Sequence, residues 1–261
     1  EVYDRVNTAL TDIGLDIWQL TQDDPDSNPT KKLKEVLPTF DAVHLMRNEK
    51  YKDACDLLRP LITGKNALLS RHAWNLLADC LLPDKECHEE LKKMLSEAPP
   101  EEWQDSRHYL HRAYLCLQLS DAENALAYAE RALELNKNLR PAMINKALAL
   151  HMLNNTIERD HIFSTLQSIG MGEHHKAAIY AMKGDFNSCI NNLQRAFVLG
   201  RYSVKNACGD VAFRVFWGLP LFDEALLPFS RKKKLTYPHK ESCQLTDVEK
   251  AIRQSVETGS R

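Results

Sequence analysis

The chain has 261 residues, of which 44% are hydrophobic, and its formal net charge is -2. This balance lacks the excess of Lys and Arg typical of a nucleic-acid binder, and no apolar run reaches the roughly 18 residues of a membrane-spanning helix. We therefore expect neither nucleic-acid binding nor membrane insertion. The seven cysteines are scattered rather than arranged as a disulfide framework, which predicts a reducing compartment and a cytoplasmic location.

Residues 1–30 are expected to form an N-terminal helix followed by a loop. Apolar residues recur every three or four positions up to residue 22, as in an amphipathic helix. The run DDPDSNP at 23–29 is rich in helix breakers and predicts the loop. The first residue is Glu1 rather than Met, so an excised fragment or a processed form stays open.

From residue 31 onward, helix-length runs follow one another in pairs. In the pair at 105–138, small residues at spacings of three and four share one face of each helix, so two antiparallel helices can approach closely. The pair at 177–201 has Gly184-Asp185-Phe186 at its turn. Alanines expected at such close contacts recur at intervals of 30 to 40 residues: Ala42, Ala73, Ala113, Ala147 and Ala177.

This arrangement resembles the tetratricopeptide repeat, a helix-turn-helix unit of about 34 residues. The resemblance covers 31–201, with two units that match well and three that lack many of the family's large aromatic and proline positions. It implies an all-α fold, an α-solenoid in which about five antiparallel helix pairs stack into a right-handed superhelix. Because an end repeat leaves an apolar face open, residues 202–229 are expected to form a C-terminal cap through Phe216, Trp217, Leu219 and Phe222. Residues 230–261 are expected to be a polar tail with a short helix.

No catalytic motif is recognisable in the sequence: it has no Gly-rich phosphate loop, no GxSxG elbow and no HExxH. Cys80, Cys87 and His88 lie close together but without the paired CxxC spacing of a zinc site. We therefore expect no enzyme activity, metal or cofactor, with core cysteines and surface histidines such as His108. The basic run 231–234 is expected to be a solvated linker, with a nuclear-localisation or phosphate-contacting cluster as the alternative.

By the same resemblance, the first helix of each pair lines a concave groove. Its inward positions would be Val43, Met46, Trp74, Leu77, Leu110, Tyr114, Leu117, Ile144, Leu148, Met152, Ala178 and Met182. Nearly all are apolar, which favours an amphipathic helix or an extended apolar peptide as the ligand. Thr39 and Val43 stand where one subset of the family has the Lys and Asn that hold a terminal carboxylate, so no such clamp is expected.

The resulting hypothesis is a non-catalytic interaction module, an adaptor, scaffold or chaperone-like protein that binds another protein in its groove. The alternative is a regulatory or targeting domain of a larger multidomain protein, possibly an enzyme. A third interpretation is a self-contained enzyme whose site is assembled only in space. The groove itself has two interpretations, because the segment from Phe213 to Phe222 could fill it from within the same chain.

Overall fold

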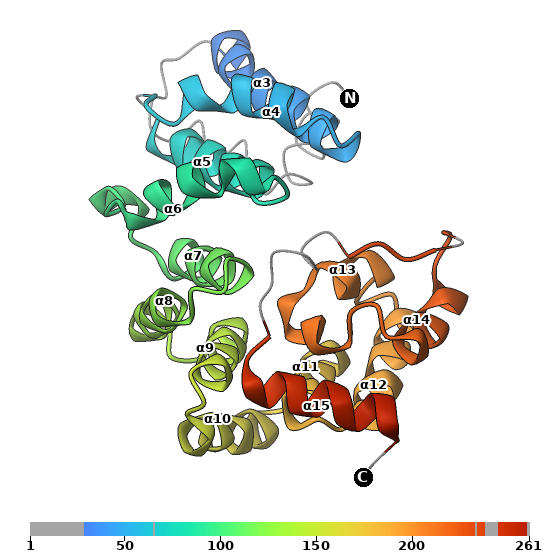
Figure 1. Cartoon of the computed structure of the whole chain (residues 1–261). Helices are drawn as coiled ribbons and strands as arrows, with labels where there is room; N and C mark the ends of the chain where they lie inside the picture. Colours follow the sequence, from blue (N-terminus) through green and yellow to red (C-terminus); the bar gives the residue numbers. More distant parts are fainter. Residues whose placement is uncertain (1–28, 65, 233, 238–244, 260–261) are drawn as a thin grey trace. The chain divides into compact units, whose positions relative to one another are not determined.

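The computed structural model describes residues 29–64, 66–232, 234–237 and 245–259. Throughout these ranges the chain is helical and contains no strand, which confirms the all-α prediction (Figure 1). The described part divides into two compact units on either side of Gln104 and Asp105. This boundary falls within 31–201, where the sequence predicts one continuous array. Almost all of the predicted N-terminal segment, 1–28, lies outside the described residues.

The first unit consists of helices around a small apolar core that includes Trp74 and Trp103. Its elements are α3 (Pro29–Arg47), α4 (Tyr51–Leu58), η1 (Arg59–Leu61), α5 (Ala67–Leu81), η2 (Lys85–Cys87), α6 (His88–Ser96) and η3 (Glu101–Trp103). Helices α3, α4 and α5 pack against one another, with Ala54, Leu58 and Ala73 fully buried. The Asn66 side chain begins α5 by accepting a hydrogen bond from Leu69 N. Small residues thus lie where these helices approach most closely.

The second unit begins with three successive helix pairs. Its elements are α7 (Ser106–Gln118), α8 (Ala122–Leu135), α9 (Arg140–Met152), α10 (Thr156–Ile169), α11 (Glu173–Lys183), α12 (Phe186–Val198), α13 (Val204–Gly209), η4 (Val211–Phe216), α14 (Pro220–Leu226), η5 (Leu227–Phe229) and α15 (Asp247–Thr258). The two helices of each pair pack against each other. Between pairs, α8 packs on α9, and α9 contacts both α7 and α11. Ala113, Ala132 and Ala147 are completely buried at these contacts. The close approach predicted for the central pair is therefore present.

Four helix pairs turn in the same way. The turn residue has φ between 59° and 77° in each: Glu49, Ser120, Asn154 and Gly184. The next backbone N–H donates to the carbonyl five residues earlier, as Asp121 N does to Cys116 O at 2.8 Å and Asp185 N does to Tyr180 O at 3.0 Å. In the second unit the residue after the turn is Asp or Asn, whose side chain caps the following helix. A common backbone turn thus recurs although only one of the four residues is glycine.

The chain after α12 folds back onto the second unit. Phe216, Trp217, Leu219 and Phe222, predicted to form a cap, are 0–2% exposed. Helix α14 packs on α12, and η4 packs on α11. At the start of α12, the ring of Phe186 meets that of Phe216 in η4 edge to face, with centroids 5.1 Å apart. Helix α15, in the stretch predicted as a polar tail, packs on η4 and buries Glu249 (red in Figure 1).

Candidate partner-binding surface

The structure distributes the predicted groove residues over both units and buries most of them. Val43, Met46, Trp74 and Leu77 belong to the first unit, where the last two are 5% and 1% exposed. In the second unit Leu110 and Tyr114 are partly exposed, whereas the remaining positions are 1–8% exposed: Leu117, Ile144, Leu148, Met152, Ala178 and Met182. These buried side chains offer little free surface, and their role in binding a partner stays a prediction.

The chain's own segment at 209–217 contacts the end of the first helix pair of the second unit. Gln118 Nε2 donates to Gly209 O at 3.0 Å, and Arg214 Nη1 donates to Ser120 Oγ at 3.3 Å. The same segment reaches α11 through η4, and Phe216 contacts Phe186 at the start of α12. Of the two interpretations of the groove, these contacts favour filling by the chain itself in this part of the molecule.

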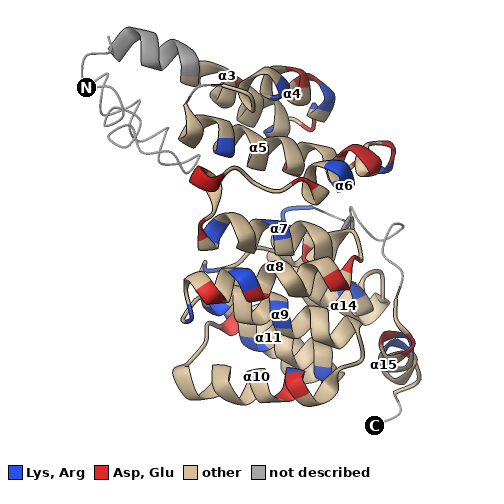
Figure 2. Ribbon diagram, turned by 90° about the vertical axis from the view of Figure 1, so that its left-hand side faces the viewer, with Lys and Arg blue, Asp and Glu red and all other residues tan. Residues whose placement is uncertain are grey.

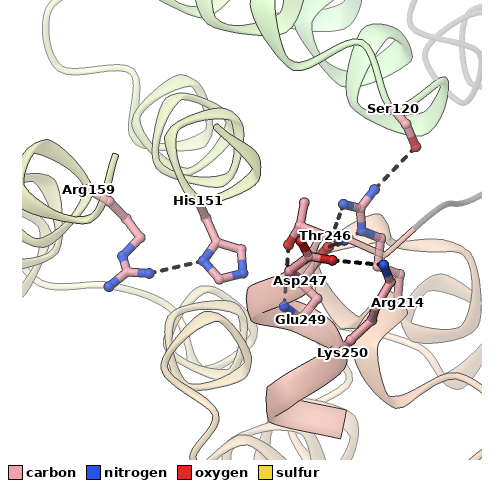
Figure 3. A network of polar contacts seen from close by, with 8 residues as sticks. All are labelled: Ser120, His151, Arg159, Arg214, Thr246, Asp247, Glu249 and Lys250. Atoms are coloured by element: carbon pink, nitrogen blue, oxygen red, sulfur yellow. Dashed lines mark hydrogen bonds and ion pairs between the residues drawn. The ribbon is translucent and has the colours of Figure 1, made fainter. Parts of the chain in front are cut away.

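A buried ion pair joins this segment to α15 (Figure 3). Arg214 and Glu249 are 2% and 3% exposed. The guanidinium donates from Nε to Oε1 and from Nη2 to Oε2, both at 2.8 Å. This two-point geometry is the strongest form of a charge-assisted hydrogen bond in proteins. Neither residue was predicted from the sequence, although a lone arginine in the apolar run DVAFRVFWGLP indicates that a buried charge needs a partner.

The start of α15 fixes the direction of the Glu249 carboxylate. Thr246 N donates to Glu249 Oε2 at 2.8 Å, and Glu249 N donates to Thr246 Oγ1 at 3.3 Å, which together form a capping box. Burial by itself would raise the pKa of Glu249, but the hydrogen bonds and charge of Arg214 outweigh it and hold the pKa below its usual value. The carboxylate therefore stays ionised in this buried position.

A second polar pair, His151 and Arg159, lies near the ion pair (Figure 3). Arg159 Nη1 donates to His151 Nδ1 at 3.0 Å, so the imidazole acts as an acceptor and must be neutral. Burial lowers the pKa of His151 to about 4; Glu249 opposes this shift, whereas the charges of Arg159 and Arg214 add to it.

His151 is 3% exposed and His108 is 1% exposed, so the expectation that His108 lies on the surface is wrong. His108 instead accepts a hydrogen bond from Arg112 Nε at 3.0 Å.

Two further contacts hold α15 along its length. Arg253 Nη1 donates to the backbone carbonyls of Val215 and Trp217, at 3.2 and 3.0 Å. Ile252 lies over the turn between α11 and α12, where a Cβ added to Gly184 would approach Ile252 Cγ1 to 3.2 Å. The glycine thus permits both the left-handed turn and the close approach of α15.

A cleft of about 720 Å³ lies at the C-terminal end of α15. The α11–α12 turn, α14 and α15 line it through Lys183, Gly184, Asp185, Phe186, Asn187, Leu221, Ser255, Val256 and Gly259. Phe186 is partly exposed and Leu221 is 50% exposed. The surface that holds α15 therefore continues as a partly apolar hollow beyond the helix.

Other polar groups in the second unit contact one another. Tyr202 Oη donates to Asp210 Oδ2 at 2.7 Å, and burial raises the pKa of both side chains. Asp210 also caps η4 by accepting from Ala212 N.

A cavity of about 530 Å³ lies beside α11 and α12, and its lining includes Lys176 and Arg195. The Lys176 ammonium is paired with the Glu173 carboxylate at 3.1 Å. The Tyr202–Asp210 and Lys176–Glu173 pairs are therefore accounted for by the local structure.

Across the described ranges, no cluster of three or more His, Cys, Asp or Glu side chains has the geometry of a metal site. No helix in the part of the chain with described coordinates has the length and apolar character needed to cross a membrane. The described cysteines are free thiols, and most of them are buried. The chain matches no protein-family model, no curated protein and no solved structure. Function must therefore be inferred from the site itself.

Proposed function

We propose that the chain is a non-catalytic protein-binding module of the adaptor, scaffold or chaperone-like kind, built on tetratricopeptide-like helix pairs. Its second unit takes up an amphipathic helix of another protein on the surface that now carries α15. The observation that supports this most directly is α15 itself, a helix of 12 residues docked on η4. A surface that already binds one short helix has the shape and donors to bind another.

The way α15 is attached resembles a bound peptide more than a core helix. Its inward contacts are made by Glu249, Ile252 and Arg253, whereas Lys250 and Gln254 are exposed. A helix of this length is marginally stable in water by itself, so α15 depends on the docking surface for its order. Figure 2 shows Lys and Arg interspersed with Asp and Glu along the helices. This mixed charge favours recognition of a partner through individual ion pairs rather than through a large surface patch of positive or negative charge.

The burial of the predicted groove residues leads to a separate prediction about the stability of the second unit. Leu117 is 1% exposed, so Leu117→Glu places a carboxylate in a dry site and is expected to destabilise the second unit by several kcal/mol, about the cost of burying an unpaired charge. Leu153→Glu, at a position that is 39% exposed, is the control and should melt close to wild type. Equal melting temperatures for the two variants would mean that Leu117 is open to solvent and available to a partner.

The proposal is tested on a chain that has folded intact. A protease site is placed within residues 238–244, and the folded protein is cut there, so that α15 is held only by its contacts. A fluorescent peptide of residues 245–259 is then added, and its anisotropy is followed.

Saturable binding of the peptide, with release of the cut α15 fragment and an unchanged circular dichroism signal from the remaining helices, is expected for a helix-binding module. If the fragment leaves only when the whole unit unfolds, α15 is a permanent part of the core and the proposal fails. A scrambled peptide of the same composition is the control for non-specific adhesion.

A further inference from the structure

The contacts of α15 also define the kind of helix that can replace it, on the basis of the proposed function. We infer that the partner is an amphipathic helix with a Ser or Thr cap, a Glu three residues later, an aliphatic residue three positions after the Glu, and a large apolar side chain near its C-terminal end. α15 is then an intramolecular competitor for the same surface.

The requirement for a carboxylate follows from Arg214. Its guanidinium is charged at all relevant pH values and is 2% exposed in the folded chain. Removing Glu249 leaves this charge buried without its main counter-ion, and a single partner lost from a buried pair is far more costly than both lost together. A helix that displaces α15 without supplying a carboxylate would therefore bind poorly.

The capping box fixes where that carboxylate must stand. Glu249 reaches Arg214 while its Oε2 also accepts from Thr246 N, so the acid belongs at the third helical position after a hydroxyl cap. The aliphatic position is fixed by Ile252, which lies against Gly184 at a distance that leaves no room for another side chain between them. The spacing of these two anchors is that of one helix face.

The last element comes from space that α15 leaves unfilled. The cleft of about 720 Å³ begins at Val256 and Gly259 and continues between Phe186 and Leu221. Helix α15 ends there because Gly259 adopts a left-handed conformation, with φ of 65°. A partner with a phenylalanine in place of Val256, which lines this cleft from within the helix, would bury apolar surface that α15 does not cover.

The occupant is a helix of another protein rather than α15 of a second copy. Tethering gives the chain's own α15 a high effective concentration at this surface, so an identical helix in trans competes at a disadvantage. A partner overcomes this competition only with contacts that α15 lacks, and the cleft provides the place for them.

The experiment uses the cut, folded chain described above and four peptides of residues 245–259. Against wild type, Glu249→Gln is expected to weaken binding about a hundredfold or more. Asp247→Asn removes one carboxylate from the same helical turn at an exposed ion pair and is expected to change binding less than about threefold. Val256→Phe is expected to strengthen binding about tenfold, because the larger ring extends into the cleft that Val256 lines. Repeating the series on the Arg214→Met chain should remove the preference for Glu over Gln.

The possible results separate the two proposals. If no peptide binds, the proposed helix-binding function is wrong. If wild-type and Glu249→Gln peptides bind equally well, that function survives and the inferred carboxylate requirement is wrong. If Val256→Phe gives no gain, the cleft plays no part in recognition. Sedimentation of the uncut chain completes the test, because a dimer held by exchanged α15 would make a second copy the occupant.

Discussion

Replacing Glu249 by glutamine tests how strongly the buried ion pair stabilises the docking of α15. The carboxylate accepts both donors of Arg214 and the N–H of Thr246, and all three distances are 2.8 Å. Glutamine keeps one acceptor oxygen but turns an amide N–H toward one donor. Removing one partner of a buried pair costs about 3–5 kcal/mol, and we expect about 3 kcal/mol here because one acceptor remains.

The loss should appear first as local opening of α15, because this helix is anchored mainly through that pair. An increase of about 3 kcal/mol in the open state corresponds to roughly a hundredfold more opening, which amide hydrogen exchange measures residue by residue. The control is Asp247→Asn, whose carboxylate pairs with Lys250 at the surface and should leave exchange nearly unchanged. Equal protection of α15 in the two variants would refute the reasoning.

A double replacement separates the cost of an unpaired charge from the loss of shape. Arg214→Met with Glu249→Leu removes both charges and retains similar apolar volume. Buried pairs replaced in this way are often as stable as the original or more so. We therefore expect the double variant to recover most of the stability lost in Glu249→Gln, measured by urea denaturation.

Three further predictions concern local packing and pH. Gly184→Ala should destabilise the chain by more than the about 1–2 kcal/mol that a left-handed backbone alone costs, because its Cβ meets Ile252 of α15. Gly200→Ala is the control, since Gly200 has a φ of 63° and its Cβ would meet nothing within 4 Å; the difference between the two in urea denaturation measures the contact. The pKa of the His151 imidazole is lowered to about 4 in the folded chain, below its usual value of about 6.5. As the pH falls from about 6.5 toward 4, the unfolded chain binds a proton at this residue before the folded chain does, so the free energy of unfolding decreases. His151→Gln should make this decrease shallower by up to about 1.4 kcal/mol per pH unit. Ala113→Leu overfills a fully buried helix contact and should cost about 1–3 kcal/mol in thermal melting, whereas the exposed Glu123→Leu should be nearly silent.

The helix pairs could be predicted from the sequence because their signals are local. Ala125, Ala129 and Ala132 lie at spacings of four and three that bring small residues to one face of α8, and the structure buries all three. The burial of the cap residues Phe216 and Phe222 could also be predicted, because a stretch dense in apolar residues at the end of an array packs against the last helix pair. A repeating pattern of side chains within one or two neighbouring helices therefore determines which helix faces pack together, whatever the rest of the chain does.

The placement of α15 was decided only by tertiary structure. Arg214 and Glu249 are separated by 35 residues, and nothing in either local pattern says that one charge neutralises the other. The capping box at Thr246 predicts where the helix begins, yet the same motif would serve a helix free in solution. The boundary after Gln104 likewise reflects where contacts thin out in space rather than a break in the repeat pattern. Long-range pairing depends on which surfaces the completed helices leave open, and that is a property of the folded chain.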